Sequence, residues 1–524
     1  MARPGFVLEV DDRTPPLAVP SGDGFRLERF PLGTRVVYPG DPIDPVPDIG
    51  EAIAEALDAP LESAPLSERL RAGMRLTIAF DDNSTPVPAM PSPDIRARII
   101  EAVLTRAAAA GVDDVALICA NGLNRRLTPA ELEALVGERV FRSFFADDLL
   151  TNHDAEDLDA HTAVGATEAG VVSLNARVAQ SDLLVYVHVA VPPNALAGPS
   201  GGPAGPAERL TAAGTVRQIR GLTGLQTRDE RGQIAVGEAI GAVIGEAVEV
   251  FEVDAVLDND SYTGLTDFLG RREWEWRVKD RVRAGVLRQG LRFAPTSPRR
   301  RAMDGVRGGY RTIAVNAGAP IAVRELSRDQ VLAQQRVEIA GQSDVAVVGV
   351  PFANPYGVDS VVNPILAAWS ALAGTLAAHV GMPVVREGGA LIAFHPLSAD
   401  FSPLHQPSYV DFFGEALTAD SDPYAIQSEA EQRFATDAWY AHLYRTSHAF
   451  HGVHPVHRWY EIAAAREHLG DVVWVGADRA NAERMGFRAA STLADALEIV
   501  GSSVGHDPTI TFLHSPPAVV SDVR

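Results

Sequence analysis

Three short segments of almost wholly apolar residues recur in the first half of this chain and limit what it can fold into. They are RLTIAF at residues 75–80, DVALIC at 114–119 and DLLVYVHV at 182–189. A strand that is apolar on both faces needs cover on both faces, as strands of parallel sheets have. The residues between them predict helices at 93–110 and 128–136 and a further strand at 140–145. This alternation predicts a parallel sheet with helices on both sides.

A second series of strands and helices is predicted in the C-terminal half. Strands are expected at residues 311–316, 345–350, 384–385, 391–395 and 472–475, and helices at 361–378, 425–442, 458–468 and 493–500. Residues 270–310, between the two series, are rich in charge and proline, which predicts a helical connector and a loop. The sequence therefore predicts an α/β protein of two doubly wound, Rossmann-like domains, residues 1–290 and 291–524.

The charge balance and the cysteine count exclude several classes of partner and location. The 524 residues include 68 acidic and 46 basic side chains, a net charge of −22, and such a chain repels a phosphate backbone. We therefore expect no nucleic-acid partner. No apolar run is long enough for a membrane span, and the first residues lack the apolar segment of a signal peptide. With a single cysteine, this pattern predicts a cytoplasmic protein.

Polar loops follow the first two apolar segments, and ligands of open α/β sheets bind at the carboxyl ends of the strands. Asp81 and Asp82 follow residues 75–80. Two carboxylates there can bind a hydroxyl group or a metal or exchange a proton, or they can simply end a strand. Gly122, Asn124 and Arg125 follow residues 114–119. Arg125 can pair with a substrate carboxylate, although a solvated turn has the same composition.

The loop after the third apolar segment is rich in glycine. Residues 192–205 contain Gly198, Ser200, Gly201 and Gly202, and their backbone N–H groups can converge on an anion. The spacing matches neither a Walker loop nor a dinucleotide-binding fingerprint. An anion site and a plain flexible loop both remain open.

Several histidines are candidates for proton transfer or metal binding. His153, His188 and His395 lie at or beside predicted strand ends, and each can act as a base or simply pack. Histidines also recur every third residue at positions 448, 451, 454 and 457. Gly452 and Pro455 interrupt a helix there, so an irregular loop is predicted. Such a loop can bring histidines together on zinc or nickel, and the candidate metal ligands are His451, His454 and His457.

Taken in order, these motifs resemble the nickel-pincer lactate racemase family. The motifs are Asp82-x-x-x-Pro86, Gly122-x-Asn-Arg125 followed by Thr-Pro-x-Glu-Leu, His153-Asp154, and the loop ending in Gly198-x-Ser-Gly-Gly202, with Glu387-Gly-Gly389 in the second half. The resemblance covers most of residues 70–515. It implies two α/β domains with a site in the cleft, and racemisation of a 2-hydroxy acid by hydride transfer. It also implies nickel held by a pyridinium thioamide cofactor that is fixed to a lysine.

The family's reactive positions carry other residues in this chain. Asp82 and Arg125 match the family. Thr85 takes the place of an arginine, and Asn124 and Asn194 take the places of the two catalytic histidines. Ala204 stands where the cofactor lysine is expected, and Arg220 is the residue near the position of the nickel-binding histidine. Asparagine keeps hydrogen bonds but does not exchange protons near neutral pH.

Three hypotheses follow for the function. The first is a racemase or epimerase of a small 2-hydroxy acid. In it Asp82, Thr85, Arg125 and the glycine loop bind the substrate or cofactor, and His153, His188 or His395 moves protons. The second is an enzyme of different, metal-dependent chemistry that works without the pincer cofactor. The third is a non-catalytic binder of a small carboxylate. The substrate, the cofactor and the oligomeric state stay open.

Overall fold

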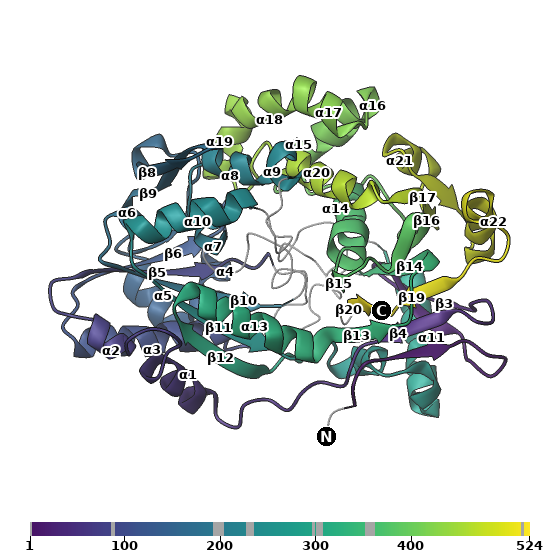
Figure 1. Ribbon diagram of the computed structural model, residues 1–524, viewed down its shortest axis with the longest axis horizontal. Helices are drawn as coiled ribbons and strands as arrows, with labels where there is room; N and C mark the ends of the chain where they lie inside the picture. The colour runs from purple at the N-terminus through teal and green to yellow at the C-terminus, as the bar shows by residue number, and fades with distance from the viewer. Residues whose placement is uncertain are drawn as a thin grey trace.

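The computed structural model describes residues 3–84, 90–191, 204–226, 235–295, 299, 308–351, 362–514 and 518–524. Within these residues the strands form two large sheets, a three-stranded sheet and a hairpin. In Figure 1 the first large sheet lies on the left and the second on the right. The two large sheets are mixed and mostly parallel, so the α/β class predicted from the sequence is confirmed.

The first large sheet has the strand order β12-β11-β10-β5-β6-β7. Its strands are β5 (Arg75–Asp81), β6 (Asp114–Ala120), β7 (Leu150–Asn152), β10 (Leu183–Ala190), β11 (Val250–Leu257) and β12 (Thr312–Gly318). The three apolar segments are β5, β6 and β10, and these strands are parallel neighbours. Only β12 runs antiparallel, beside β11. The carboxyl ends of β5, β6 and β10 therefore meet at one edge.

Apolar residues on both faces of this sheet are covered, as the apolar segments require. One face packs on α1 (Ile49–Asp58), α3 (Ile95–Ala109) and α4 (Pro129–Val136) through Ile53, Ile99 and Leu132. The other face packs on α8 (Ala213–Arg220), α10 (Ala235–Ala247) and the hairpin of β8 (His161–Thr167) and β9 (Gly170–Asn175). The strand predicted at 140–145 is wrong, because α5 (Glu138–Phe144) occupies this segment and stacks Phe141 on Phe145 one turn later.

The second large sheet has the strand order β1-β4-β19-β14-β16-β17-β18, with β2 paired to β14 and β3 to β2. Its strands are β1 (Phe6–Glu9), β2 (Leu17–Gly22), β3 (Phe25–Glu28), β4 (Arg35–Tyr38), β14 (Ser343–Pro351), β16 (Val385–Phe394), β17 (Leu469–Val475), β18 (Arg488–Ala490) and β19 (Ile510–Leu513). The helix α22 (Leu493–Val504) covers one face, and α14 (Pro364–Trp369) and α20 (His454–Arg466) cover the other. The strands predicted at 384–385 and 391–395 are two parts of β16.

The two sheets interleave along the chain. β1 to β4 come first in the sequence yet join the second sheet, and β12, which was expected to begin the second series, closes the first sheet. The small sheet consists of β13 (Arg336–Ile339), β20 (Val520–Val523) and β15 (His379–Gly381). A division of the chain at residue 290 remains a prediction, since strand pairing crosses that residue in both directions.

The remaining helices connect and cover the sheets (Figure 1). They are α2 (Leu66–Arg69), α6 (Ala176–Ala179), α7 (Ala204–Arg209), α9 (Leu222–Gln226), α11 (Val278–Phe293), α13 (Pro320–Gln335), α15 (Pro407–Asp411), α16 (Leu417–Ala419), α17 (Pro423–Ile426), α18 (Gln432–Thr436), α19 (Ala438–Thr446) and α21 (Arg479–Arg484). The predicted loop at 447–457 ends at Val453, because Pro455 is tolerated in the first turn of α20. None of the helices in the described part of the chain has the length and apolar character needed to cross a membrane.

Candidate functional site

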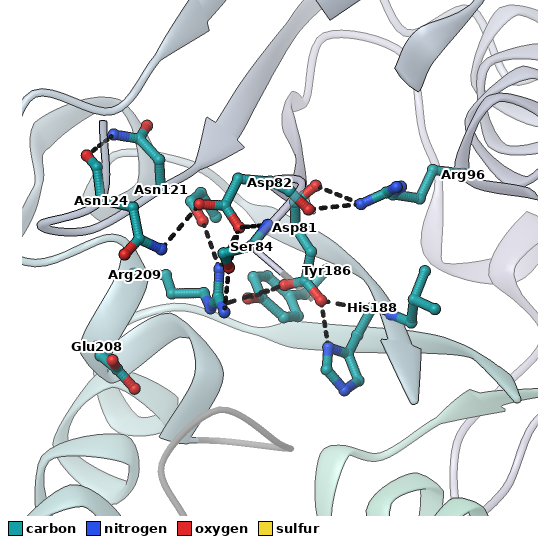
Figure 2. Close-up of polar contacts among 12 residues, drawn as sticks. Asp81, Asp82, Ser84, Arg96, Asn121, Asn124, Tyr186, His188, Glu208 and Arg209 are labelled. Carbon is teal, nitrogen blue, oxygen red and sulfur yellow. Dashed lines mark hydrogen bonds and ion pairs between the residues drawn. The ribbon is translucent and has the colours of Figure 1, made fainter. Parts of the chain in front are cut away.

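Two buried carboxylates lie at the carboxyl end of β5 and bind different partners (Figure 2). The phenol of Tyr186 donates to Asp81 at 2.8 Å, and the Nδ1 atom of His188 forms a second contact with Asp81. Burial opposes the charged forms of both groups. The charges of His188 and Arg209 nevertheless lower the pKa of Asp81, and Asp81 raises the pKa of His188. Asp81 and His188 therefore form a buried ion pair that stays charged near neutral pH.

Asp82 lies beside this pair and is held by an arginine from α7. Arg209 donates to Oδ1 of Asp82 at 2.8 Å, and the amide of Asn124 donates to Oδ2 at 2.9 Å. The backbone N–H of Ser84 also donates to Asp82 at 3.0 Å. Arg209 is itself buried, and despite burial the two nearby carboxylates keep its pKa well above the usual value. The carboxylate of Asp82 is thus fully occupied by groups of this chain.

Asn124 connects this cluster to the second half of the molecule. The Nε2 atom of His454 lies 3.0 Å from Oδ1 of Asn124, and the hydroxyl of Tyr409 lies 2.7 Å from Nδ1 of the same histidine. Because Oδ1 only accepts, Nε2 of His454 carries the proton and the hydroxyl of Tyr409 donates to Nδ1. Burial lowers the pKa of His454 well below 6.5, which agrees with a neutral ring.

A glycine lets the loop that carries Asn124 pack against α7. Gly122 has a φ of +51°, and a Cβ atom there would lie 2.8 Å from the carbonyl oxygen of Glu208. Its N–H donates to the carbonyl of Arg209 at 3.1 Å, and its own carbonyl accepts from the hydroxyl of Tyr444 at 2.6 Å. The turn at residues 121–124 is therefore clamped between both halves of the chain.

A narrow cavity lies where this turn, α7, α8 and α20 meet. Its lining residues are Asn121, Gly122, Leu123, Asn124, Glu208, Arg209, Val216, Arg220, His454, His457, Arg458 and Glu461. The space open to a water-sized molecule is about 20 Å³, which is room for one or two waters. The buried atoms at this cavity without a hydrogen-bond partner among the described residues include Nε2 of His457, Oδ1 of Asn121 and Oε2 of Glu208. Burial and the nearby arginines lower the pKa of His457, so this ring is neutral and can accept a proton.

Ion pairs close the cavity on the side of α20. Arg220 contacts Glu208 at 2.6 Å and Glu461 at 2.5 Å. Arg458 contacts the same Glu461 at 2.7 Å. Two guanidinium groups thus share one largely buried carboxylate.

Residues 28–207 match the family described as the lactate racemase N-terminal domain. The match covers about a third of the chain. The fold agrees over nearly the whole length with the lactate racemase apoprotein from Thermoanaerobacterium thermosaccharolyticum, at 14% identity, 97% coverage of this chain, 100% coverage of that chain and a TM-score of 0.63. A protein from Thermotoga maritima aligns at 12% identity over 91% of this chain and 97% of its own, with a TM-score of 0.49. No curated protein matches the sequence.

Two predicted site residues in the segment that matches this family, Arg125 and His153, bind structural partners. Arg125 forms a two-pronged ion pair with Glu131 rather than lying open to a substrate. His153 donates from Nε2 to the carbonyl of Thr211 at 2.9 Å, and its Nδ1 accepts from Asn175 at 3.3 Å. The cavity beside Asn124 is lined by neither Arg125 nor His153.

The histidines from the second half separate into different surroundings. His395 follows β16, where its Nδ1 accepts from the backbone N–H of Leu397 at 3.0 Å. His451 contacts Glu156 at 2.7 Å, whereas His454 and His457 line the cavity. The described residues contain no group of three side chains that could hold a metal ion. The predicted metal ligands are therefore not brought together in the described part of the chain.

Six of the predicted site residues lie outside the described residues. They are Thr85, Asn194, Gly198, Ser200, Gly201 and Gly202. Their roles stay predictions.

The residues of the described site do not fit the family's nickel pincer cofactor. Position 204 opens α7 with an alanine, which has no amine for a covalent link. The cavity is lined by Arg209, Arg220 and Arg458, and guanidinium groups repel a metal cation instead of binding it. No step of the proposal below depends on that cofactor.

Sequence reasoning missed Arg209, Tyr409 and the role of His457. Arg209 carried one signal, since it lies on the helix that follows the glycine loop and the carboxyl end of β10. Nothing in the local sequence pairs Tyr409 with His454, or His454 with Asn124, 330 positions earlier, because the second contact exists only when the two halves pack.

Proposed function

We propose that this protein is a cofactor-independent isomerase of a small 2-hydroxy acid, and that its substrate binds in the cavity beside Asn124. The observation that carries the proposal is the unpartnered Nε2 atom of the buried, neutral His457 in a cavity lined by arginines. We also propose that the two halves of the chain are doubly wound units with a cleft between them, as the resemblance to lactate racemases implies. The family match and the lactate racemase fold support the substrate class.

The arginines supply a site for the carboxylate of the substrate. Arg220 and Arg458 already hold the carboxylate of Glu461. A bound carboxylate can share these guanidinium groups, since bidentate arginine pairs are the strongest carboxylate contacts. Because the cavity now has room for only one or two waters, entry of a three-carbon acid requires α20 or the Glu461 side chain to move. Substrate binding is therefore coupled to opening of this edge.

His457 is the base of the proposed reaction. In the proposal Nε2 of His457, which has no hydrogen-bond partner among the described residues, carries no proton and takes the α-proton of the bound acid. The electron pair left on the α-carbon is delocalised into the carboxylate beside the arginines. Return of the proton from His457 regenerates the substrate. Protonation of the other face by a water molecule gives the opposite enantiomer, and the hydroxide formed takes the proton from His457. His454 donates its Nε2 proton to Asn124 and holds that side chain in place.

Isotope exchange tests this chemistry. We expect the protein, assayed in D₂O without added nickel or cofactor, to place deuterium at the α-carbon of D- or L-lactate or glycolate, as measured by NMR. Hydride transfer would instead invert lactate with the α-hydrogen retained. His457→Gln should abolish exchange, and His442→Gln, on an exposed helix position, serves as the control.

Calorimetry separates binding from catalysis. If the protein binds lactate but neither exchanges its α-hydrogen nor inverts it, the isomerase activity is refuted. The protein would then be a carboxylate-binding protein. No binding of any 2-hydroxy acid would refute the substrate class as well.

A further inference from the structure

A second and larger cavity lies away from Asn124, between segments that belong to different sheets. It is lined at β4 by Tyr38, after β11 by Asn259 and after β19 by His514. Its volume is about 220 Å³, ten times the space beside Asn124 and below the roughly 300–1,000 Å³ of pockets for drug-sized ligands. It therefore has the size for a small metabolite. No lining residue is shared with the first cavity.

Arg272 is the charged group of this cavity that the protein holds least tightly. Its side chain is 8% exposed, and it stacks on Phe6 with the guanidinium carbon 4.4 Å from the ring centroid. Its ion pairs to Asp41 and Glu275 are long, at 3.7 and 3.5 Å, and Arg272 makes no closer polar contact within the described parts of the chain. The stacked ring fixes the guanidinium plane and leaves its edge free for a carboxylate.

The neighbouring cations are already paired. Arg3 holds Asp41 at 2.7 Å and Glu275 at 2.6 Å. Arg271 holds Asp267 at 2.7 Å. Asp41 and Glu275 thus form hydrogen bonds with Arg3, and Arg272 makes only the two longer ion pairs with them.

Acceptors for a hydrogen-bond donor lie on another wall of the cavity. Asn259 is 4% exposed, and its Nδ2 donates to the carbonyl of Gly40 at 3.0 Å. Its Oδ1 is buried and has no partner among the described residues. Asp260 lies beside it, and burial together with Asp258 raises the pKa of Asp260, although the charge of Arg311 opposes this shift. The Oδ1 atom of Asn259 thus lacks a donor, and within the described parts of the chain the guanidinium of Arg272 makes only its two long ion pairs.

We propose that this cavity binds a small carboxylic acid with a hydrogen-bond donor on the α-carbon. The carboxylate pairs with Arg272, and the hydroxyl or ammonium group donates to Oδ1 of Asn259. The site is separate from the proposed catalytic cavity. Because it lies between the ends of strands from both sheets, its ligand bridges them.

Calorimetry with three acids tests the proposal and identifies the donor. Glycolate carries a hydroxyl, glycine carries an ammonium group, and acetate carries neither. The proposal expects glycolate or glycine to bind at least tenfold more tightly than acetate in the His457→Gln protein, where loss of the catalytic base does not alter this cavity. Equal binding of all three, or no binding, would overturn it. A negative result for this cavity would not change the deuterium exchange that is expected from His457.

Two substitutions locate the bound acid. Arg272→Gln should abolish binding, and Asn259→Ala should remove the preference over acetate. Arg283→Gln, an exposed arginine of α11 that contacts Asp267 at 3.3 Å, is the control and should bind as the wild type. If Arg272→Gln fails to fold, Asn259→Ala still decides the outcome. Unchanged binding in the Asn259→Ala protein would refute the site.

Discussion

Asn124 and His454 lie 330 positions apart in the sequence and are joined by a 3.0 Å hydrogen bond between Oδ1 and Nε2. The contact continues from His454 to Tyr409 and from Asn124 to Asp82. In this series of hydrogen bonds each donor meets an acceptor. The uncharged amide of Asn124 therefore connects His454 to Asp82 without exchanging a proton. Asn124 therefore joins the two halves of the molecule.

Replacing Asn124 with alanine should destabilise the protein. Asn124→Ala removes the acceptor of His454 and one donor to Asp82, and unpaired buried groups cost about 1–3 kcal/mol. Urea unfolding measures this loss. Asn83→Ala is the matched control, since Asn83 is only partly buried and its amide makes one 3.1 Å contact, with Glu131. Equal stability of Asn124→Ala and wild type would contradict the hydrogen-bonded connection.

Stability should fall as the solution becomes acidic, in part because of His153. Burial lowers the pKa of His153 to about 4. Between that value and the usual 6.5 of the unfolded chain, the unfolded state binds the proton and the folded state does not. The stabilisation is therefore complete above pH 6.5 and is lost as pH falls toward 4.

Comparison with a variant isolates this contribution. From pH 6.5 to 5 it amounts to about 2 kcal/mol, at about 1.4 kcal/mol per pH unit. His153→Gln should therefore lose about that much less stability than the wild type over this range. Parallel pH profiles for the two proteins would show that His153 titrates normally. His506→Gln, at an exposed position, should leave the wild-type profile unchanged.

A side chain at position 122 should disturb the catalytic cavity. Gly122→Ala meets two penalties, the left-handed φ of +51° and a Cβ only 2.8 Å from the carbonyl oxygen of Glu208. We expect a loss of more than the roughly 1 kcal/mol that left-handed strain costs, with weaker lactate binding. Gly33→Ala, with a φ of +80° and no atom within 4 Å of the new Cβ, carries the strain alone. Melting temperatures of the two variants measure the difference, and equal losses would contradict the close packing of this turn.

Sequence reasoning worked best where a local pattern decides the structure. The apolar segments that became β5, β6 and β10 were found because burial on both faces leaves no polar positions in a strand. It failed at 140–145, where a short apolar pattern fits a strand or one face of a helix equally well. At the site it located Asp82 and Asn124 but not their partners. Arg125 looked free in the sequence, yet Glu131, six residues later in the first turn of α4, forms an ion pair with it.

The amino-acid sequence alone determined the α/β class and the edge at which polar loops gather. These are properties of single positions and of short periodic segments. Only the tertiary structure decided that β1 to β4 join the far sheet, that His454 reaches Asn124, and that Arg272 pairs at long range with Asp41. Each depends on contacts between residues hundreds of positions apart, and such contacts arise from the packing of whole elements, which no local pattern encodes.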